Sequence, residues 1–122
     1  MKLFHPGVHR ILDFATVVIL VLTPILSGFG GLFALVLFLL AAVHLVLTLV
    51  TRFSPGGVGA VSFWTHGIIE IVVAVALVAT PFVFGFGIGS PSKRAYIFLG
   101  VWVFLVWLLT DYRVSERTPA AA

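Results

Sequence analysis

The sequence predicts an all-α membrane protein with four transmembrane helices, arranged as two parallel helix-hairpin repeats. The first observation is composition: 61% of the 122 residues are hydrophobic and only 9% are charged, whereas soluble domains carry about 25% charged residues. The second is that residues 14–51, 71–92 and 95–110 contain no Asp, Glu, Lys or Arg. Such stretches are long enough to cross a hydrocarbon core of about 30 Å at about 1.5 Å per helical residue.

The third observation is an internal repeat. The segment "HRILDFATVVILVLTPILSGFG" (residues 9–30) aligns without a gap with "HGIIEIVVAVALVATPFVFGFG" (residues 66–87), and ten of the 22 positions are identical. The copies are separated by two crossings, so the repeated hairpins are expected to be parallel and related by an axis along the membrane normal. We expect a single transmembrane domain, residues 1–122, with repeats over about 5–53 and 62–113.

Each helix is placed between turn signals. The hydrophobic runs predict helices over about residues 8–26, 32–50, 62–86 and 96–110. Glycine, proline and polar residues predict turns or coil at "SGFGG" (27–31), "RFSPGGVGA" (52–60), "GIGSPSKR" (87–94) and the tail "SERTPAAA" (115–122).

The basic residues predict the orientation, because cytoplasmic loops carry an excess of Lys and Arg. With a cytoplasmic N-terminus, the inside carries five: Lys2, Arg10, Arg52, Arg113 and Arg117. The outside carries two, Lys93 and Arg94. We therefore expect both termini in the cytoplasm, and we attribute the net charge of +3 to topology and not to nucleic-acid binding.

A buried polar layer is predicted from the repeated His and acidic residues. His9 and Asp13 share a helix face, as do His66 and Glu70, because residues i and i+4 are neighbours on a helix. The acids lie roughly 12 Å into their helices, and His44 reaches a similar depth from a helix running the other way. A lipid-facing charge costs about 2.5–3.5 kcal/mol, so these side chains should face the interior and be paired.

Three interpretations of this layer remain open. The His and acidic groups can neutralise one another and hold the helices together. Alternatively, His44, His66 or His9 can ligate a haem or a (bacterio)chlorophyll, since imidazole is a common axial ligand. A proton relay through His44, Glu70 and Asp13 is the third, because such chains mark proton pathways in membranes. The sequence points to no catalytic residue and predicts no metal site, and the absence of cysteine excludes a thiolate metal site.

The repeated Thr-Pro pairs predict helix kinks at Thr23, Pro24, Thr80 and Pro81. Proline lacks an N–H and frees the carbonyl four residues earlier, and a threonine hydroxyl can help to satisfy the disturbed ladder. Small residues that let helices approach are expected at Gly28, Gly85 and Gly89. An aromatic belt at the membrane boundaries is expected from Trp64, Tyr96, Trp107 and Tyr112.

At these steps the chain resembles the SPW-repeat membrane proteins of bacteria and archaea, small proteins built from a two-helix unit that is often present twice. The unit of that family has a Ser-Pro-Trp step followed by Gly-Phe. Here the matching residues are Thr23-Pro24-Ile25 and Thr80-Pro81-Phe82, then Gly28-Phe29 and Gly85-Phe86. The resemblance implies a prokaryotic source and a doubled hairpin, and it implies no enzyme chemistry.

Together these features favour a non-catalytic integral membrane protein that contacts lipid and packs against other membrane subunits or itself. The expected role is a structural or accessory subunit of a complex or homo-oligomer in a prokaryotic cytoplasmic membrane. The alternatives from other classes are a haem- or (bacterio)chlorophyll-binding subunit of a redox or photosynthetic complex, and a small proton-coupled carrier.

Overall fold

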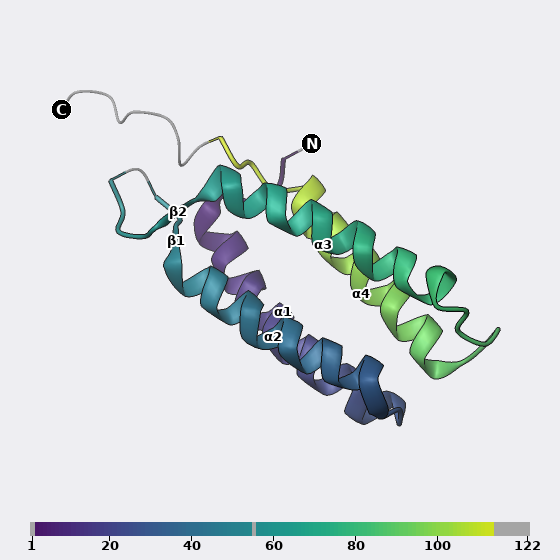
Figure 1. Ribbon diagram of the computed structural model, residues 1–122. Coiled ribbons are helices and arrows are strands. Elements are labelled where there is room, and N and C mark those ends of the chain that lie inside the picture. The colour runs from purple at the N-terminus through teal and green to yellow at the C-terminus, as the bar shows by residue number, and fades with distance from the viewer. Residues whose placement is uncertain (1, 55, 114–122) are drawn as a thin grey trace.

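The computed structural model describes residues 2–54 and 56–113 and is built almost entirely of helices (Figure 1). The elements are α1 (Pro6–Ser27), α2 (Gly31–Val50), β1 (Thr51–Arg52), β2 (Val61–Ser62), α3 (Phe63–Val83) and α4 (Pro91–Leu108). All four helices are long and apolar enough to cross a membrane. The prediction of an all-α protein with four candidate spans is confirmed. The tail 115–122 and Arg117 lie outside the described residues.

The helix ends follow from local capping chemistry. Helix α1 begins at Pro6, where proline is tolerated because the first N–H groups have no intrahelical partner, and His5 accepts a hydrogen bond from the Gly7 N–H. The predicted start of the fourth helix at residue 96 is wrong, since α4 begins at Pro91 with Ser90 accepting from the Lys93 N–H. Ser-Pro is a helix start signal, and it places the second half of "GIGSPSKR" inside α4 and not in the expected turn.

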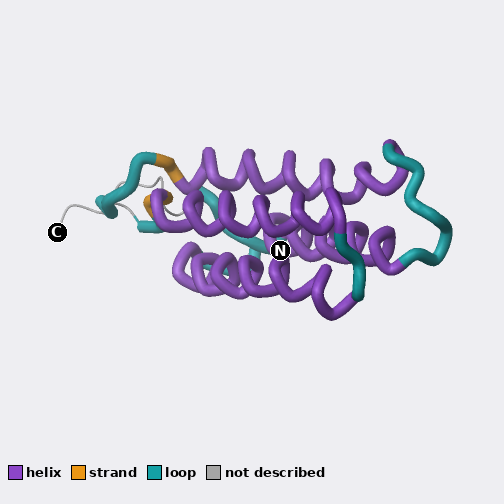
Figure 2. Tube along the Cα trace, turned by 60° about the horizontal axis from the view of Figure 1, so that its bottom comes forward, coloured by secondary structure: helices purple, strands orange, loops and turns teal. Residues whose placement is uncertain are grey.

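The helices pack as neighbouring pairs: α1 contacts α2, α3 contacts α4, and α1 also contacts α4. Both short connections between paired helices, residues 28–30 and 84–90, lie at one end of the molecule (Figure 1). Strands β1 and β2 lie at the opposite end, as Figure 2 also shows. We call these the turn end and the strand end.

Backbone bridges that the sequence did not predict join the chain at the strand end. Strand β1 pairs in parallel with β2, with Thr51 opposite Val61, and the two strands flank the glycine- and proline-rich stretch 52–60 that was expected to be a turn. An isolated parallel bridge joins Phe4 to Thr110. Residues that precede α1 and α3 are thereby fixed beside residues that follow α4 and α2.

The apolar core lies between the paired helices and includes Leu20, Leu37, Ala41, Ala74, Leu77, Tyr96, Leu99 and Val103. The glycine that allows close helix approach is Gly100, where an added Cβ would lie 2.9 Å from the Ala74 carbonyl oxygen on α3. The expectation for Gly28, Gly85 and Gly89 is wrong. They have positive φ and open space at the Cβ position, so they serve turn conformation.

The Thr-Pro steps are satisfied within their own helices. Pro24 lies inside α1 and Pro81 inside α3. The Thr23 hydroxyl donates to the Ile19 carbonyl at 2.6 Å, and the Thr80 hydroxyl donates to the Ala76 carbonyl at 2.6 Å. The hydroxyls thus bond carbonyls adjacent to those that the prolines free, and the predicted kinks stay a prediction.

Large apolar side chains face outward along all four helices. Leu26 and Val83 are 79% and 74% exposed, and many other apolar side chains on the four helices are exposed to a smaller extent. Such a surface is consistent with a lipid bilayer, because lipid tails are as apolar as these side chains and contact with them exposes no apolar surface to water.

Candidate functional site: a buried histidine–carboxylate cluster

Five side chains from three helices meet inside the strand end of the bundle. We call them the His/carboxylate cluster: His9 and Asp13 on α1, His44 on α2, and His66 and Glu70 on α3. They are exposed by 0%, 1%, 6%, 0% and 3% respectively. The structure therefore brings together every residue of the predicted polar layer.

Helix periodicity and capping put these groups at one level. Asp13 is the eighth residue of α1 and Glu70 the eighth of α3, counting from Pro6 and Phe63. Each has its histidine one turn earlier on the same face. The start of α3 is set by Ser62, whose hydroxyl accepts from the Thr65 N–H, a typical N-cap.

The carboxylates stand between the histidine rings. Asp13 Oδ1 lies 3.0 Å from His9 Nε2 and 3.4 Å from His44 Nε2, and Asp13 Oδ2 lies 3.1 Å from His66 Nε2. Glu70 Oε2 is 3.1 Å from His9 Nε2, and Glu70 Oε1 is 3.3 Å from His66 Nε2. Each carboxylate thus contacts the histidines of both α1 and α3.

Several of these close contacts lack hydrogen-bond geometry. Both oxygens of Asp13, and the Nε2 atoms of His44 and His66, are buried without a hydrogen bond of suitable angle among the described residues. Their separations are nevertheless within ion-pair range. A buried polar group without a hydrogen bond typically costs about 1–3 kcal/mol, so the cluster favours a positive species among its atoms, either protons or a bound cation.

A second layer of hydroxyl groups surrounds the cluster. His9 Nδ1 lies 2.8 Å from Thr110 Oγ1, and His66 Nδ1 lies 2.8 Å from Thr51 Oγ1. The Tyr112 hydroxyl donates to Glu70 Oε2. Sequence reasoning did not assign these three residues to the site, because they lie 15 to 101 positions from the cluster residues that they contact.

Tyr112 corrects the expected aromatic belt. It is 6% exposed, and an alanine Cβ at Gly67 would come within 2.8 Å of its ring, so the glycine makes room for it. Burial raises the pKa of Tyr112 above its usual range, and the neighbouring Glu70 carboxylate raises it further. Tyr96 is also buried, and its hydroxyl donates to the Phe33 carbonyl at 2.6 Å at the turn end.

Aromatic rings close the cluster toward the strand end. The ring centroid of Phe63 lies 5.1 Å from that of His9, and the Phe53 centroid lies 5.6 Å from that of His66. Tyr112 lies 5.3 Å from His9 and 4.6 Å from Phe63. These rings separate the charged groups from the surface and lower the local polarity, which strengthens electrostatic interactions within the cluster.

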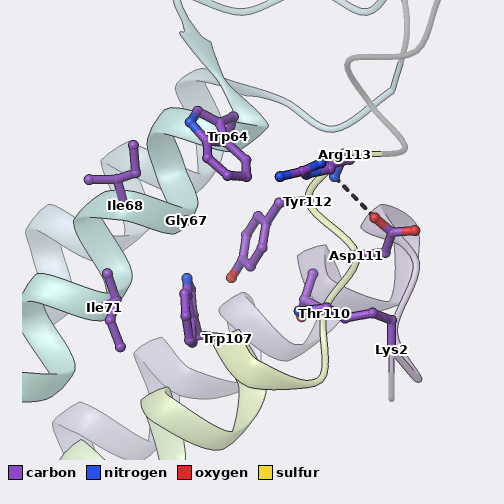
Figure 3. A pocket seen from close by; sticks show the side chains of 10 residues that line it. All are labelled: Lys2, Trp64, Gly67, Ile68, Ile71, Trp107, Thr110, Asp111, Tyr112 and Arg113. Atoms are coloured by element: carbon purple, nitrogen blue, oxygen red, sulfur yellow. Dashed lines mark hydrogen bonds between the residues drawn. The ribbon is translucent and has the colours of Figure 1, made fainter.

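A pocket of about 400 Å³ lies directly outside this layer. Figure 3 shows Tyr112 among its lining side chains, with Trp64 and Trp107 on either side in this view. Thr110 also lines the pocket. Because Tyr112 contacts Glu70 and Thr110 contacts His9, these two residues belong both to the pocket wall and to the outer layer of the cluster.

The other sequence-predicted residues lie elsewhere. The predicted kink residues, Thr23 with Pro24 and Thr80 with Pro81, lie near the turn ends of α1 and α3, so they do not contribute to the cluster. The three possible pigment ligands are brought together, with ring centroids 5.4 Å apart for His9 and His66 and 6.2 Å apart for His44 and His66.

Comparison with known proteins gives no assignment: no family model, no curated protein and no solved structure matches this chain.

Proposed function

We propose that this protein is a non-catalytic integral membrane protein, a structural or accessory subunit of a larger membrane complex or of a homo-oligomer. The observation that carries the proposal is how the His/carboxylate cluster is assembled. Its members come from α1, α2 and α3. Its outer contacts come from Thr51, which follows α2, and Thr110, which follows α4. A cluster of this kind holds the helices together, and it contains both buried carboxylates of the described residues, Asp13 and Glu70.

The contacts at the strand end support two parallel hairpin repeats. Phe4 pairs with Thr110, and Val61 pairs with Thr51. Phe4 and Val61 are 57 residues apart, which is the offset of the sequence repeat (61 minus 4, and 66 minus 9). In this proposal each repeat begins beside the end of the other, as expected for two copies related by rotation about the membrane normal.

The charge distribution supports cytoplasmic termini. Lys2, Arg10, Arg52 and Arg113 belong to segments at the strand end, and Lys93 and Arg94 belong to the first turn of α4 at the turn end. The excess of basic residues favours a cytoplasmic strand end. A prokaryotic membrane is proposed from the resemblance to the SPW-repeat proteins.

Single cysteines test this orientation, since the chain has none of its own. Ser54→Cys lies in the β1–β2 connection, and Ile88→Cys, at a residue that is 97% exposed, lies in the α3–α4 connection. A membrane-impermeant maleimide applied to intact cells should label Ile88→Cys and not Ser54→Cys. The reverse pattern would show that the orientation is inverted.

The subunit role is tested by the mass of the native particle. Tagged protein should be extracted from its own membrane in a mild detergent and its mass measured by native mass spectrometry over a dilution series. We expect a particle heavier than one chain, containing further copies or other membrane proteins. A single chain at all concentrations would contradict the subunit role.

The two alternatives stay predictions. A haem or (bacterio)chlorophyll ligated by His9, His44 or His66 needs open space beside an Nε2 atom, whereas these atoms face carboxylate oxygens at 3.0–3.4 Å. A proton-coupled carrier is compatible with the continuous His44–Asp13–His66–Glu70 contacts, and it needs in addition a path to both sides of the membrane.

A further inference from the structure

The threonine hydroxyls fix which ring nitrogen of each histidine carries a proton. Thr110 Oγ1 donates to the Val106 carbonyl at 2.5 Å, so its only hydrogen is used. His9 Nδ1, at 2.8 Å from the same oxygen, must therefore be the donor. Metal-binding histidines show this arrangement, in which the second ring nitrogen donates to a neighbouring oxygen and orients the first.

The same arrangement occurs at the second histidine. Thr51 Oγ1 donates to the Leu47 carbonyl at 2.5 Å, and His66 Nδ1 lies 2.8 Å from it. Both rings, one on α1 and one on α3, thus point Nε2 into the cluster. In a neutral imidazole that carries its proton on Nδ1, Nε2 has a free lone pair and can only accept a hydrogen bond or bind a cation.

Two lone pairs facing two carboxylates require a positive charge between them. The nearest oxygens of Asp13 lie 3.0 Å from His9 Nε2 and 3.1 Å from His66 Nε2. Protonating the histidines supplies the charge, but the His66 Nε2 and both Asp13 oxygens then remain without a hydrogen bond of suitable angle. A cation bound among these atoms would contact each of them directly, so no N–H bond would have to point at a carboxylate oxygen.

The spacing fits one small ion. One donor atom from each of His9, Asp13, His66 and Glu70 can be chosen so that all lie within 4.8 Å of one another. The two histidine Nε2 atoms lie 3.0 and 3.1 Å from the nearer oxygens of Asp13 and 3.1 and 3.3 Å from oxygens of Glu70, with both oxygens of each carboxylate taking part. A tetrahedral ion with bonds of about 2.0–2.2 Å has ligand atoms roughly 3.3–3.6 Å apart. The close histidine–carboxylate contacts would lengthen slightly to admit it, and any pair of donors near the 4.8 Å limit would move closer.

The donor set selects the class of ion. Two imidazole nitrogens and two carboxylates suit Zn²⁺ and similar divalent transition metals, whereas Ca²⁺ and Mg²⁺ prefer all-oxygen sites. Two carboxylates also balance a divalent charge, which matters in a site whose four donors are at most 3% exposed. The Tyr112 hydroxyl on Glu70 Oε2 and the His44 ring beside Asp13 orient the carboxylates from outside.

We propose that His9, Asp13, His66 and Glu70 form an intramembrane binding site for one divalent transition-metal ion of the Zn²⁺ class, oriented by Thr51, Thr110 and Tyr112. The sequence alone predicted no metal site, and the tertiary structure brings the two i,i+4 pairs together. This inference goes beyond the proposed structural role, since the cluster can also hold the helices together with protons.

The test is metal binding by the full chain, purified in detergent with a tag that contains no histidine. After chelator treatment and dialysis, Zn²⁺ is added and counted by elemental analysis, and Co²⁺ is titrated as a visible-absorbing probe. We expect one Zn²⁺ per chain and the intense absorption of four-coordinate Co²⁺, which Zn²⁺ then displaces. A parent protein that binds neither ion would overturn the proposal.

Variants distinguish this site from incidental binding. His66→Gln should weaken Zn²⁺ binding by more than about 100-fold, and Thr51→Val, which removes only the orienting hydroxyl, by roughly 10–100-fold. His5→Ser is the matched control, because it removes an exposed histidine outside the cluster and retains an N-cap side chain. If His66→Gln does not fold, as judged by circular dichroism, Thr51→Val decides.

Unchanged affinity in Thr51→Val, or equal loss in His5→Ser, would contradict the assignment. The structural role is judged separately, from the stability of metal-free protein and from the mass of the native particle. A chain that lacks metal affinity but depends on the cluster for stability would therefore overturn only the metal site.

Discussion

The two ends of the bundle use the same repeated sequence in opposite ways. At the turn end, the repeated Thr23 and Thr80 hydroxyls bond carbonyls of their own helices. At the strand end, the repeated His9 and His66 contact carboxylates of both helices, as well as hydroxyls that follow α4 and α2. One repeated motif is therefore satisfied locally and the other only by the tertiary fold.

The difference shows what a repeat in a membrane helix can mean. A Thr-Pro step solves a backbone problem that arises within one turn of helix, so each copy is complete by itself. A carboxylate in hydrocarbon needs a partner, and here each carboxylate contacts the histidine of the other copy as well as its own. The following substitutions compare the two ends, all measured in chelator-treated protein by unfolding in mixed detergent micelles.

The largest effect is expected from Glu70. Glu70→Leu removes the carboxylate that hydrogen-bonds to His9 Nε2 and accepts from the Tyr112 hydroxyl, and breaking a buried charged pair in this way typically costs about 3–5 kcal/mol. Glu70→Gln should cost less, because an amide still accepts hydrogen bonds. At the turn end, Thr23→Val should cost only about 0.5–1.5 kcal/mol. If the Leu variant is as stable as the Gln variant, the cluster does not hold the helices together.

A smaller contrast is expected from the two buried tyrosines. Tyr112 donates to a carboxylate at the strand end and Tyr96 to a backbone carbonyl at the turn end. Hydrogen bonds to charged groups contribute about 1.5–3 kcal/mol, and neutral ones about 0.5–1.5 kcal/mol. Tyr112→Phe should therefore lower the free energy of unfolding more than Tyr96→Phe does. Equal losses would mean that Glu70 is not ionised in the folded protein.

The smallest contrast is expected from two glycines. An added methyl group at Gly67 meets the Tyr112 ring at 2.8 Å, whereas at Gly87 the nearest atom is 4.0 Å away. Overpacking costs about 1–3 kcal/mol, so Gly67→Ala should destabilise the protein and Gly87→Ala should change stability by less than about 0.5 kcal/mol. An unaffected Gly67→Ala variant would mean that Tyr112 has room to move away from Glu70.

Much of the architecture was predictable because hydrophobic length and turn residues are local signals. The uncharged stretches gave four helices, and the "SGFGG" turn was expected between the first two, where the structure leaves residues 28–30 outside α1 and α2. The predicted start of the fourth helix is wrong because Lys93 and Arg94 interrupt the apolar run, although both lie within α4. In α4 the two charged residues lie in the first turn, where Ser90 caps the helix and Pro91 begins it, as is typical of helix N-termini.

By itself, the sequence determined which residues would be costly to expose to lipid, since charge and helix periodicity decide that one residue at a time. From this followed an interior layer containing His9, Asp13 and Glu70. Only the tertiary structure decided which atoms meet: that Thr110 approaches His9, Thr51 approaches His66, and Tyr112 enters the space left by Gly67. Contacts between residues 15 to 101 positions apart depend on how the helices pack, and no local pattern in the chain encodes that packing.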